Sequence, residues 1–192
     1  QHRDQFYKKS KTLGYRSRSA FKLIELNKKF NFIKKSTNFL DIGSCPGGWS
    51  QVASQIIEIG KMVSVDIKKM NEIKNVKFIN ADFLTNETKD KISLLFANKI
   101  DVIVSDMAAN TTGNKNLDCI RTNMLCADVI NFSTEFLKKE GVLVAKLFMG
   151  EDFIEVKKLA KKKFKRVDFF KPDSSRDESK ETYIHCKSLK TL

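Results

Sequence analysis

The sequence predicts an α/β fold in which a mostly parallel sheet carries helices on both faces. Short apolar runs rich in β-branched residues recur along the chain, at residues 38–42, 62–67, 76–81, 100–106 and 141–148. Helix-length stretches separate most of these runs, notably residues 47–59, 118–138 and 151–163. Apolar strands that alternate with helices are typical of a parallel sheet whose two faces are both covered.

Two further strands and one further helix complete the predicted fold. The segments FKRVDFF, residues 164–170, and TYIHCKS, residues 182–188, have the composition of strands near the end of the chain. Ahead of the first strand, residues 17–30 predict a helix with Ser17 or Ser19 as its N-cap. We expect its inward face to hold the apolar residues Ala20, Leu23, Ile24 and Phe30.

Length and composition indicate one domain. At 192 residues, 41% of them hydrophobic, the chain is long enough to bury a substantial core. We expect a single, monomeric domain over residues 1–192, with a basic N-terminal extension and helix at 1–35 and an α/β core at 36–192. No apolar run approaches the roughly 18–20 residues of a membrane span, and the basic start lacks the core of a signal peptide, so we expect no membrane association. The first residue is Gln, which leaves open whether residues precede it.

The cysteines and histidines do not form a metal-binding pattern. The four cysteines are scattered with no C-x-x-C spacing, at Cys45, Cys119, Cys126 and Cys186, and the chain has two histidines. We therefore expect no metal ion and interpret the cysteines as the reduced thiols of a cytosolic protein.

The positive charge of the chain is concentrated in two segments. The formal net charge is +13; residues 1–35 carry a net of +9 and residues 157–171 a net of +7, so the remainder is mildly acidic. This distribution favours a surface that binds a polyanion such as a nucleic acid. The alternative is a lysine-rich composition with solvated helix faces.

Polar residues follow the predicted strands in a consistent way. Asp41, Asp66, Asp82, Asp106 and Lys146 all lie at or just beyond a predicted strand end. Ligands of open α/β sheets bind outside the carboxyl ends of the strands, so we expect these residues to gather at one edge. Asp is common in loops, which accounts for any one position more easily than for all five.

The turn after the first strand, GSCPGG, excludes two phosphate-binding motifs. Cys45 stands where the dinucleotide fingerprint G-x-G-x-x-G needs its second glycine, and no G-K-[ST] is present, which rules out a P-loop. We expect Pro46 to stiffen the turn, and Gly47 and Gly48 to leave room for a bulky ligand.

The acidic strand ends favour a ligand that has no phosphate. The carboxylate of Asp66 is placed to accept the two hydroxyls of a ribose, and Asp82 follows the next strand, near the expected position of an adenine. Carboxylates in place of phosphate donors suit a cationic adenosyl compound. The pattern therefore predicts S-adenosylmethionine as the cofactor.

Five segments together resemble the FtsJ/RrmJ family of ribosomal RNA 2′-O-methyltransferases. They occur in the order and spacing of that family and cover about Tyr7 to Cys186: YRSRSAFKLIEL, LDIGSCPGGWSQ, VSDMAANTTG, VAKLFMGEDF and KPDSSRDESKETYI. The resemblance implies a Rossmann-like methyltransferase fold, with a mostly parallel seven-stranded sheet whose last strand is antiparallel.

The resemblance also implies specific site residues. A catalytic tetrad falls on Lys22, Asp106, Lys146 and Glu181. The cofactor contacts of the family fall on Gly47, Trp49, Asp66, Asp82 and Asp106. Three of these residues also have a simpler interpretation. Trp49 could belong to the core, Lys22 could be a helix lysine that reaches solvent, and Glu181 could be an edge carboxylate paired with Lys180 or Arg176.

Lys146 is the candidate general base for a ribose hydroxyl. It lies within an otherwise apolar strand, where an unpaired charge is costly. Burial and the cation of Lys22 would lower its pKa, whereas Asp106 and Glu181 would raise it. The sequence leaves that balance open.

The expected activity is methyl transfer from S-adenosylmethionine to a ribose 2′-hydroxyl in large-subunit ribosomal RNA. The resemblance implies ribosomal RNA or the large subunit as partner, a uridine as target, and a cytoplasmic protein in a bacterium or an organellar one in a eukaryote. A transfer-RNA methyltransferase and a non-catalytic RNA-binding assembly factor are the alternatives.

The first basic segment is then expected to hold the RNA. Five of its cations lead directly into the helix that bears Lys22, and we expect them to contact phosphates: Lys8, Lys9, Lys11, Arg16 and Arg18. The alternative path for the RNA runs along residues 157–171.

Overall fold

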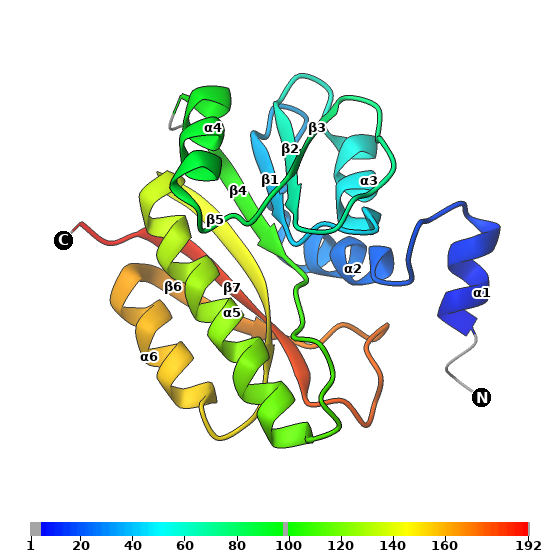
Figure 1. The fold of residues 1–192 in the computed structure, drawn as a ribbon, viewed down its shortest axis with the longest axis vertical. Helices are drawn as coiled ribbons and strands as arrows, with labels where there is room; N and C mark the ends of the chain where they lie inside the picture. Colours follow the sequence, from blue (N-terminus) through cyan, green and yellow to red (C-terminus); the bar gives the residue numbers. More distant parts are fainter. Residues whose placement is uncertain (1–4, 98–99, 192) are drawn as a thin grey trace.

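Seven strands form one sheet in this computed structural model, which describes residues 5–97 and 100–191. They are β1 (Phe39–Ile42), β2 (Met62–Asp66), β3 (Val76–Asn80), β4 (Ile100–Ser105), β5 (Leu137–Phe148), β6 (Phe164–Phe170) and β7 (Glu181–Leu189). Their order is β3-β2-β1-β4-β5-β7-β6 (Figure 1). Strands β1 to β5 pair in parallel, and β7 runs antiparallel to both of its neighbours. The predicted mostly parallel sheet with an antiparallel last strand is confirmed.

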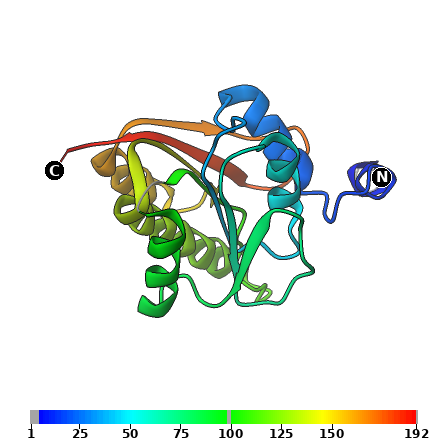
Figure 2. The same ribbon diagram turned by 90° about the horizontal axis from the view of Figure 1, so that it is seen from above.

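Helices cover both faces of the sheet. They are α1 (Gln5–Thr12), α2 (Ala20–Phe30), α3 (Gly48–Ile56), α4 (Asn86–Phe96), α5 (Lys115–Phe136) and α6 (Phe153–Lys163). Helices α2 and α3 pack on one face, and α4, α5 and α6 lie on the other (Figure 2). Helix α1 stands away from both layers at the end of a connecting segment (Figures 1 and 2).

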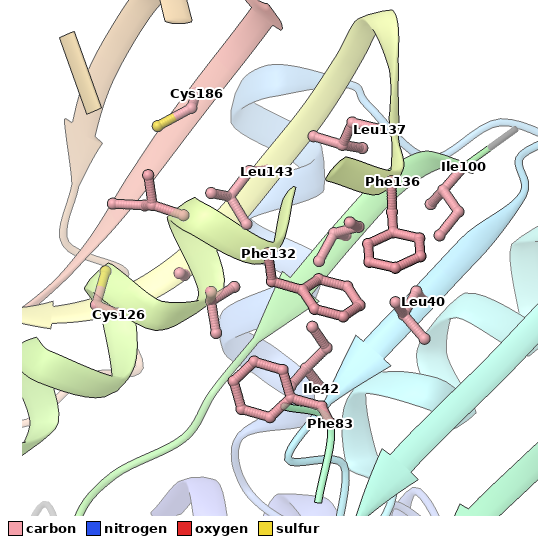
Figure 3. Close-up of a cluster of buried hydrophobic side chains, with 14 of the residues drawn as sticks. Leu40, Ile42, Phe83, Ile100, Cys126, Phe132, Phe136, Leu137, Leu143 and Cys186 are labelled. Carbon is pink, nitrogen blue, oxygen red and sulfur yellow. The ribbon is translucent and has the colours of Figure 1, made fainter. Parts of the chain in front are cut away.

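The larger apolar core lies between the sheet and α4, α5 and α6. Phe132 and Phe136 of α5 stack with ring centroids 4.4 Å apart, and Phe83 meets Phe132 edge-on at 5.5 Å. They pack against buried Leu40 and Ile42 of β1 (Figure 3). Burying a large apolar side chain contributes about 1.5–3 kcal/mol, so this cluster holds α5 firmly against the strands.

Several details of the predicted elements are wrong. Ser19 occupies the N-cap position of α2, but neither it nor Ser17 caps the helix; the two hydroxyls bond to each other at 2.7 Å. Ile24 is 36% exposed rather than inward, and Leu26 is buried in its place. Helix α4 was not predicted, although Thr85 marks its start by accepting a hydrogen bond from the Thr88 N–H.

The sheet topology determines where the polar strand ends meet. The carboxyl ends of the parallel strands β1 to β5 lie at one edge of the sheet, here called the carboxyl edge. Because β7 runs the opposite way, its first residues reach the same edge: Glu181 pairs with Phe148, and Tyr183 pairs with Lys146. A residue at the start of the last strand thereby joins residues at the ends of the others.

Candidate active site

Four elements bring the predicted tetrad together at the carboxyl edge. Lys22 lies in the first turn of α2, Asp106 directly follows β4, Lys146 is near the end of β5, and Glu181 begins β7. Lys22, Lys146 and Glu181 are each 8–9% exposed. Charged side chains are this deeply buried only when they are paired.

The tetrad forms an alternating chain of charges. Lys22 Nζ lies 2.6 Å from Glu181 Oε1, and Lys146 Nζ lies 3.6 Å from Glu181 Oε2 and 3.0 Å from Asp106 Oδ1. Glu181 therefore bridges the two lysines, and Lys146 lies between two carboxylates. Its amine also donates to the backbone oxygen of Asp106 at 3.1 Å. Two ammonium groups balance two carboxylates, which offsets part of the cost of burying them.

Two residues without a role in the sequence-based prediction hold the carboxylates in place. The hydroxyl of Tyr183 donates to Asp106 Oδ1, and the hydroxyl of Ser175 donates to Glu181 Oε1 at 2.9 Å. Side chains two apart in a strand share one face, so the two-residue spacing of Glu181 and Tyr183 was the available signal for Tyr183.

The two carboxylates keep Lys146 charged. Burial alone would lower the pKa of Lys146, but Asp106 and Glu181 outweigh burial and raise the pKa above its ordinary value of 10.5. Burial would likewise raise the pKa of Glu181, but Lys146 and Lys22 hold it below its usual 4.5. The sequence left open whether burial or the carboxylates dominate the pKa of Lys146, and the surroundings of the amine favour its ammonium form. Burial and the same two carboxylates raise the pKa of Tyr183 well above 10, so its hydroxyl stays a neutral donor.

The glycines of the first turn make room for neighbouring parts of the protein. Gly47 has a φ of +105° at the N-cap of α3, a conformation that favours glycine. A Cβ added to Gly47 would lie 2.9 Å from Ile73, and one added to Gly48 would lie 2.2 Å from the Ser17 hydroxyl. The missing side chain of Gly48 admits the segment before α2, and its expected role in ligand access stays a prediction.

The other predicted cofactor residues occupy different environments. Asp66 ends β2 and accepts hydrogen bonds from the backbone N–H of Cys45 and of Lys68, at 2.8 and 2.7 Å. Asp82 is exposed and accepts from the Leu84 N–H at 2.9 Å. A carboxylate oxygen can accept more than one hydrogen bond, so the side chains of Asp66 and Asp82 both retain capacity for a ligand.

Trp49 lies in the smaller core cluster, beneath the turn. It is 2% exposed, its indole N–H donates to the Ser19 carbonyl at 2.9 Å, and its ring lies 5.6 Å from that of Tyr183. These contacts favour the interpretation of Trp49 as core. Contact with a cofactor stays a prediction for all five positions.

Asp41 is buried within the sheet, one residue before β1 ends. It is 1% exposed, and its carboxylate accepts from the Ser50 hydroxyl at 2.7 Å. The Ser50 and Ser64 hydroxyls also contact each other at 2.5 Å. Burial raises the pKa of Asp41 to about 7, against the lowering effect of the Ser50 hydrogen bond.

Arg16 and Arg18 of the first basic segment bond to distant parts of the fold. Arg16 donates to the carbonyls of Asn71 and Glu72, both at 2.6 Å, and of Pro46 at 3.3 Å. It thus ties together the loops that follow β1 and β2. Arg18 donates to the Ser174 carbonyl at 3.1 Å. Arg16 is thus engaged by three backbone carbonyls, which makes it less available for phosphates than expected. Arg18 makes one such bond of the five that a guanidinium can donate, so its predicted phosphate contact stays a prediction.

The three lysines that precede these arginines lie on the surface of the first helix. Lys8, Lys9 and Lys11 lie on exposed positions of α1. Lys9 Nζ lies 5.4 Å from the ring centroid of Phe21, and Lys11 Nζ lies 5.6 Å from that of Tyr7. Their predicted contacts with RNA stay a prediction.

The described part of the chain has neither a metal cluster nor a spanning helix. No group of three or more His, Cys, Asp or Glu residues within residues 5–97 and 100–191 is placed to hold a metal ion. None of the helices in the same residues combines the length and apolar character that crossing a bilayer requires.

The sheet order, the single antiparallel strand and the polar carboxyl edge define a Rossmann-like methyltransferase. The family model of the FtsJ-like methyltransferases matches residues 15–189, and the chain belongs to this family. It is 49% identical over 190 residues to a Pelagibacter ubique protein named ribosomal RNA large subunit methyltransferase E, covering 99% of this chain and 94% of that protein.

Solved structures agree with this assignment of the fold. A ribosomal RNA methyltransferase from Plasmodium falciparum superposes with a TM-score of 0.80 at 32% identity, covering 91% of this chain and 98% of the other. Human methyltransferase-like protein 13 in complex with SAH superposes with a TM-score of 0.60 at 16% identity, covering 88% and 79%. At that identity the second likeness concerns the fold alone.

Proposed function

We propose that this protein transfers a methyl group from S-adenosylmethionine to the 2′-hydroxyl of a ribose, a uridine by the family resemblance, in large-subunit ribosomal RNA. The observation that carries the proposal is the buried chain Lys22–Glu181–Lys146–Asp106 at the carboxyl edge. The names of the relatives support ribosomal RNA as the substrate. From the same relatives we propose a cytoplasmic protein, or an organellar one in a eukaryote. We propose separately that it acts as a monomer.

The residues at the carboxyl edge fit the cofactor. Asp66, Asp82 and Asp106 follow β2, β3 and β4 and offer hydrogen-bond acceptors, which suit ribose hydroxyls, an adenine amine and a cationic centre. When bound, the cofactor supplies an electrophilic methyl group, so the protein has to align and deprotonate the acceptor hydroxyl. Gly47 and Trp49 would complete the pocket.

The tetrad divides the remaining work. Asp106 orients the Lys146 amine, which would contact the acceptor hydroxyl directly. Lys22 and Glu181 hold the ribose and balance the charge. Lys146 acts as a base only after its ammonium group loses a proton. A cation close to Asp106 would weaken the attraction between Asp106 and that ammonium group, which would lower the pKa of Lys146 and favour the loss.

The decisive experiment is transfer of a tritium-labelled methyl group to large ribosomal subunits that lack the modification, with the labelled nucleotide mapped. We expect label on one ribose 2′-oxygen. Lys146→Ala should abolish transfer while cofactor affinity, measured by calorimetry, changes by no more than a few-fold.

Two results would overturn the proposed activity, and a third would overturn the role of Lys146. Label on transfer RNA alone would move the activity to the alternative substrate. RNA binding without any transfer would identify a non-catalytic assembly factor. A folded Lys146→Ala variant that no longer binds cofactor would remove Lys146 from its assigned role.

A further inference from the structure

A hollow of about 500 Å³ lies at the opposite edge of the sheet from the tetrad. It is formed by the end of α2, the segment between α2 and β1, the first residues of β4 and β5, and the parts of β6 and β7 that face them. We call it the basic groove. Its floor includes His185, whose ring stacks on Phe30 with centroids 4.0 Å apart.

Five cationic side chains line the basic groove. They come from four different elements and the loop after α2, and they are Lys29, Lys34, Lys138, Arg166 and Lys187. Two acidic residues line it with them, Asp101 and Glu140. One of the five, Arg166, belongs to the second basic segment, residues 157–171. The active site does not explain the charge of that segment.

The acidic residues are already engaged. Lys138 pairs with Asp101 at 2.5 Å, and Glu140 accepts from the Ser188 hydroxyl at 2.6 Å. That hydrogen bond, together with Lys165, Lys139 and Lys187, holds the pKa of Glu140 below its ordinary value, as expected where positive charge dominates.

Three lysines of the groove form no ion pair among the described residues. Arg166 pairs with Asp168 at 2.7 Å, but Lys29, Lys34 and Lys187 have no ion pair with any residue that the structure describes. All three are exposed. Like charges gathered around a hollow repel one another, and an external polyanion relieves that repulsion.

We propose that the basic groove binds the phosphate backbone of RNA, as a second contact remote from the reacting ribose. The inference rests on the proposed RNA substrate. Lysine ammonium groups on flexible stems suit phosphate oxygens and read no sequence, so this contact adds affinity and orientation without selecting the nucleotide.

The length of the strands separates the two contacts. Glu181 and Lys187 are six residues apart in β7, which corresponds to about 20 Å at roughly 3.3 Å per residue. An RNA that touches both has to extend well past the reacting nucleotide and its immediate neighbours. A large folded RNA meets this requirement better than a short oligonucleotide does.

The test measures equilibrium binding of a transcript of bacterial large-subunit ribosomal RNA at several salt concentrations. The groove variant combines Lys34→Gln with Lys187→Gln. The matched control combines Lys74→Gln with Lys77→Gln, which removes the same charge from exposed lysines at β3. Each lost phosphate contact lowers the slope of log affinity against log salt by about 0.7–0.9, so we expect the groove variant to lose about 1.5 and the control nothing measurable.

A charge-conserving variant checks that the groove still folds. Lys34→Arg combined with Lys187→Arg should keep the wild-type slope, and all variants should keep wild-type cofactor affinity and kcat. An unchanged slope in the groove variant, or equal losses in the groove and control variants, would overturn the inference. Methyl transfer by the wild-type protein to the same transcript tests the proposed function separately, because the groove is judged by binding alone.

Discussion

Lys146 lies between Asp106 and Glu181, and this position determines how its activity should depend on pH. Because both carboxylates raise its pKa above 10.5, the neutral amine is scarce at neutral pH. If the neutral amine is the base, the single-turnover rate should rise with pH between pH 6 and 10. A rate that stays flat from pH 6 to 10, with chemistry limiting, would instead assign Lys146 to alignment as an ammonium group.

Glu181→Gln is the matched check on this pH profile. The substitution removes one of the two carboxylates that raise the pKa of Lys146. The rise in rate should therefore move to lower pH, although the maximal rate falls because Lys22 loses its partner. An unmoved profile would show that the titrating group is not Lys146.

Asp41 should make folding stability depend on pH in an unusual direction. Its pKa is about 7 in the folded protein against an ordinary 3.8, so the folded state binds the extra proton between these values. The free energy of unfolding should then fall as pH rises from about 4 to 7, by roughly 4 kcal/mol at most, and level off above.

Asp41→Asn removes this titration and retains an acceptor for the Ser50 hydroxyl. The variant should match the wild type near pH 4 and exceed it in stability at pH 8, which urea unfolding at three pH values measures. A difference between the two proteins that does not change with pH would contradict the assigned pKa.

At the scale of elements, Arg16 joins the segment before α2 to the loops after β1 and β2. Arg16→Gln cannot span the three carbonyls of Pro46, Asn71 and Glu72. Hydrogen bonds from charged groups contribute about 1.5–3 kcal/mol, so we expect cofactor binding about tenfold weaker and a lower melting temperature. Lys11→Gln, from exposed α1, should change neither. Wild-type cofactor affinity in Arg16→Gln would show that these loops keep their shape without it.

At the scale of the whole molecule, α1 presents a cluster of exposed lysines. Replacing Lys8, Lys9 and Lys11 by Gln should leave stability and cofactor affinity nearly unchanged, because all three side chains are exposed. It should raise KM for RNA and lower the salt slope by about two, equally for RNAs of different sequence. A fall in melting temperature with an unchanged slope would make α1 structural and leave the basic groove as the main RNA contact.

Local sequence patterns were sufficient to predict the parallel strands and the edge of the sheet where their polar ends meet, whereas the antiparallel last strand came from the family resemblance. Each apolar run became a strand because burial on both faces favours continuous β-branched residues, as in β2 and β4. Parallel strands then place Asp66, Asp106 and Lys146 at one edge for geometric reasons alone. The resemblance supplied Lys22 and Glu181, which no periodic pattern would have joined to them.

The partners and protonation states of the side chains depended on the tertiary structure. Arg16 resembles a phosphate ligand in sequence, yet its carbonyl partners lie up to 56 positions away, and Arg18 reaches a carbonyl 156 positions away. The raised pKa values of Asp41 and Lys146 depend on what surrounds each group after folding. Strand and helix preferences act between near neighbours and can be read from a linear pattern, whereas electrostatics and hydrogen bonding depend on distances in space that only the packed chain defines.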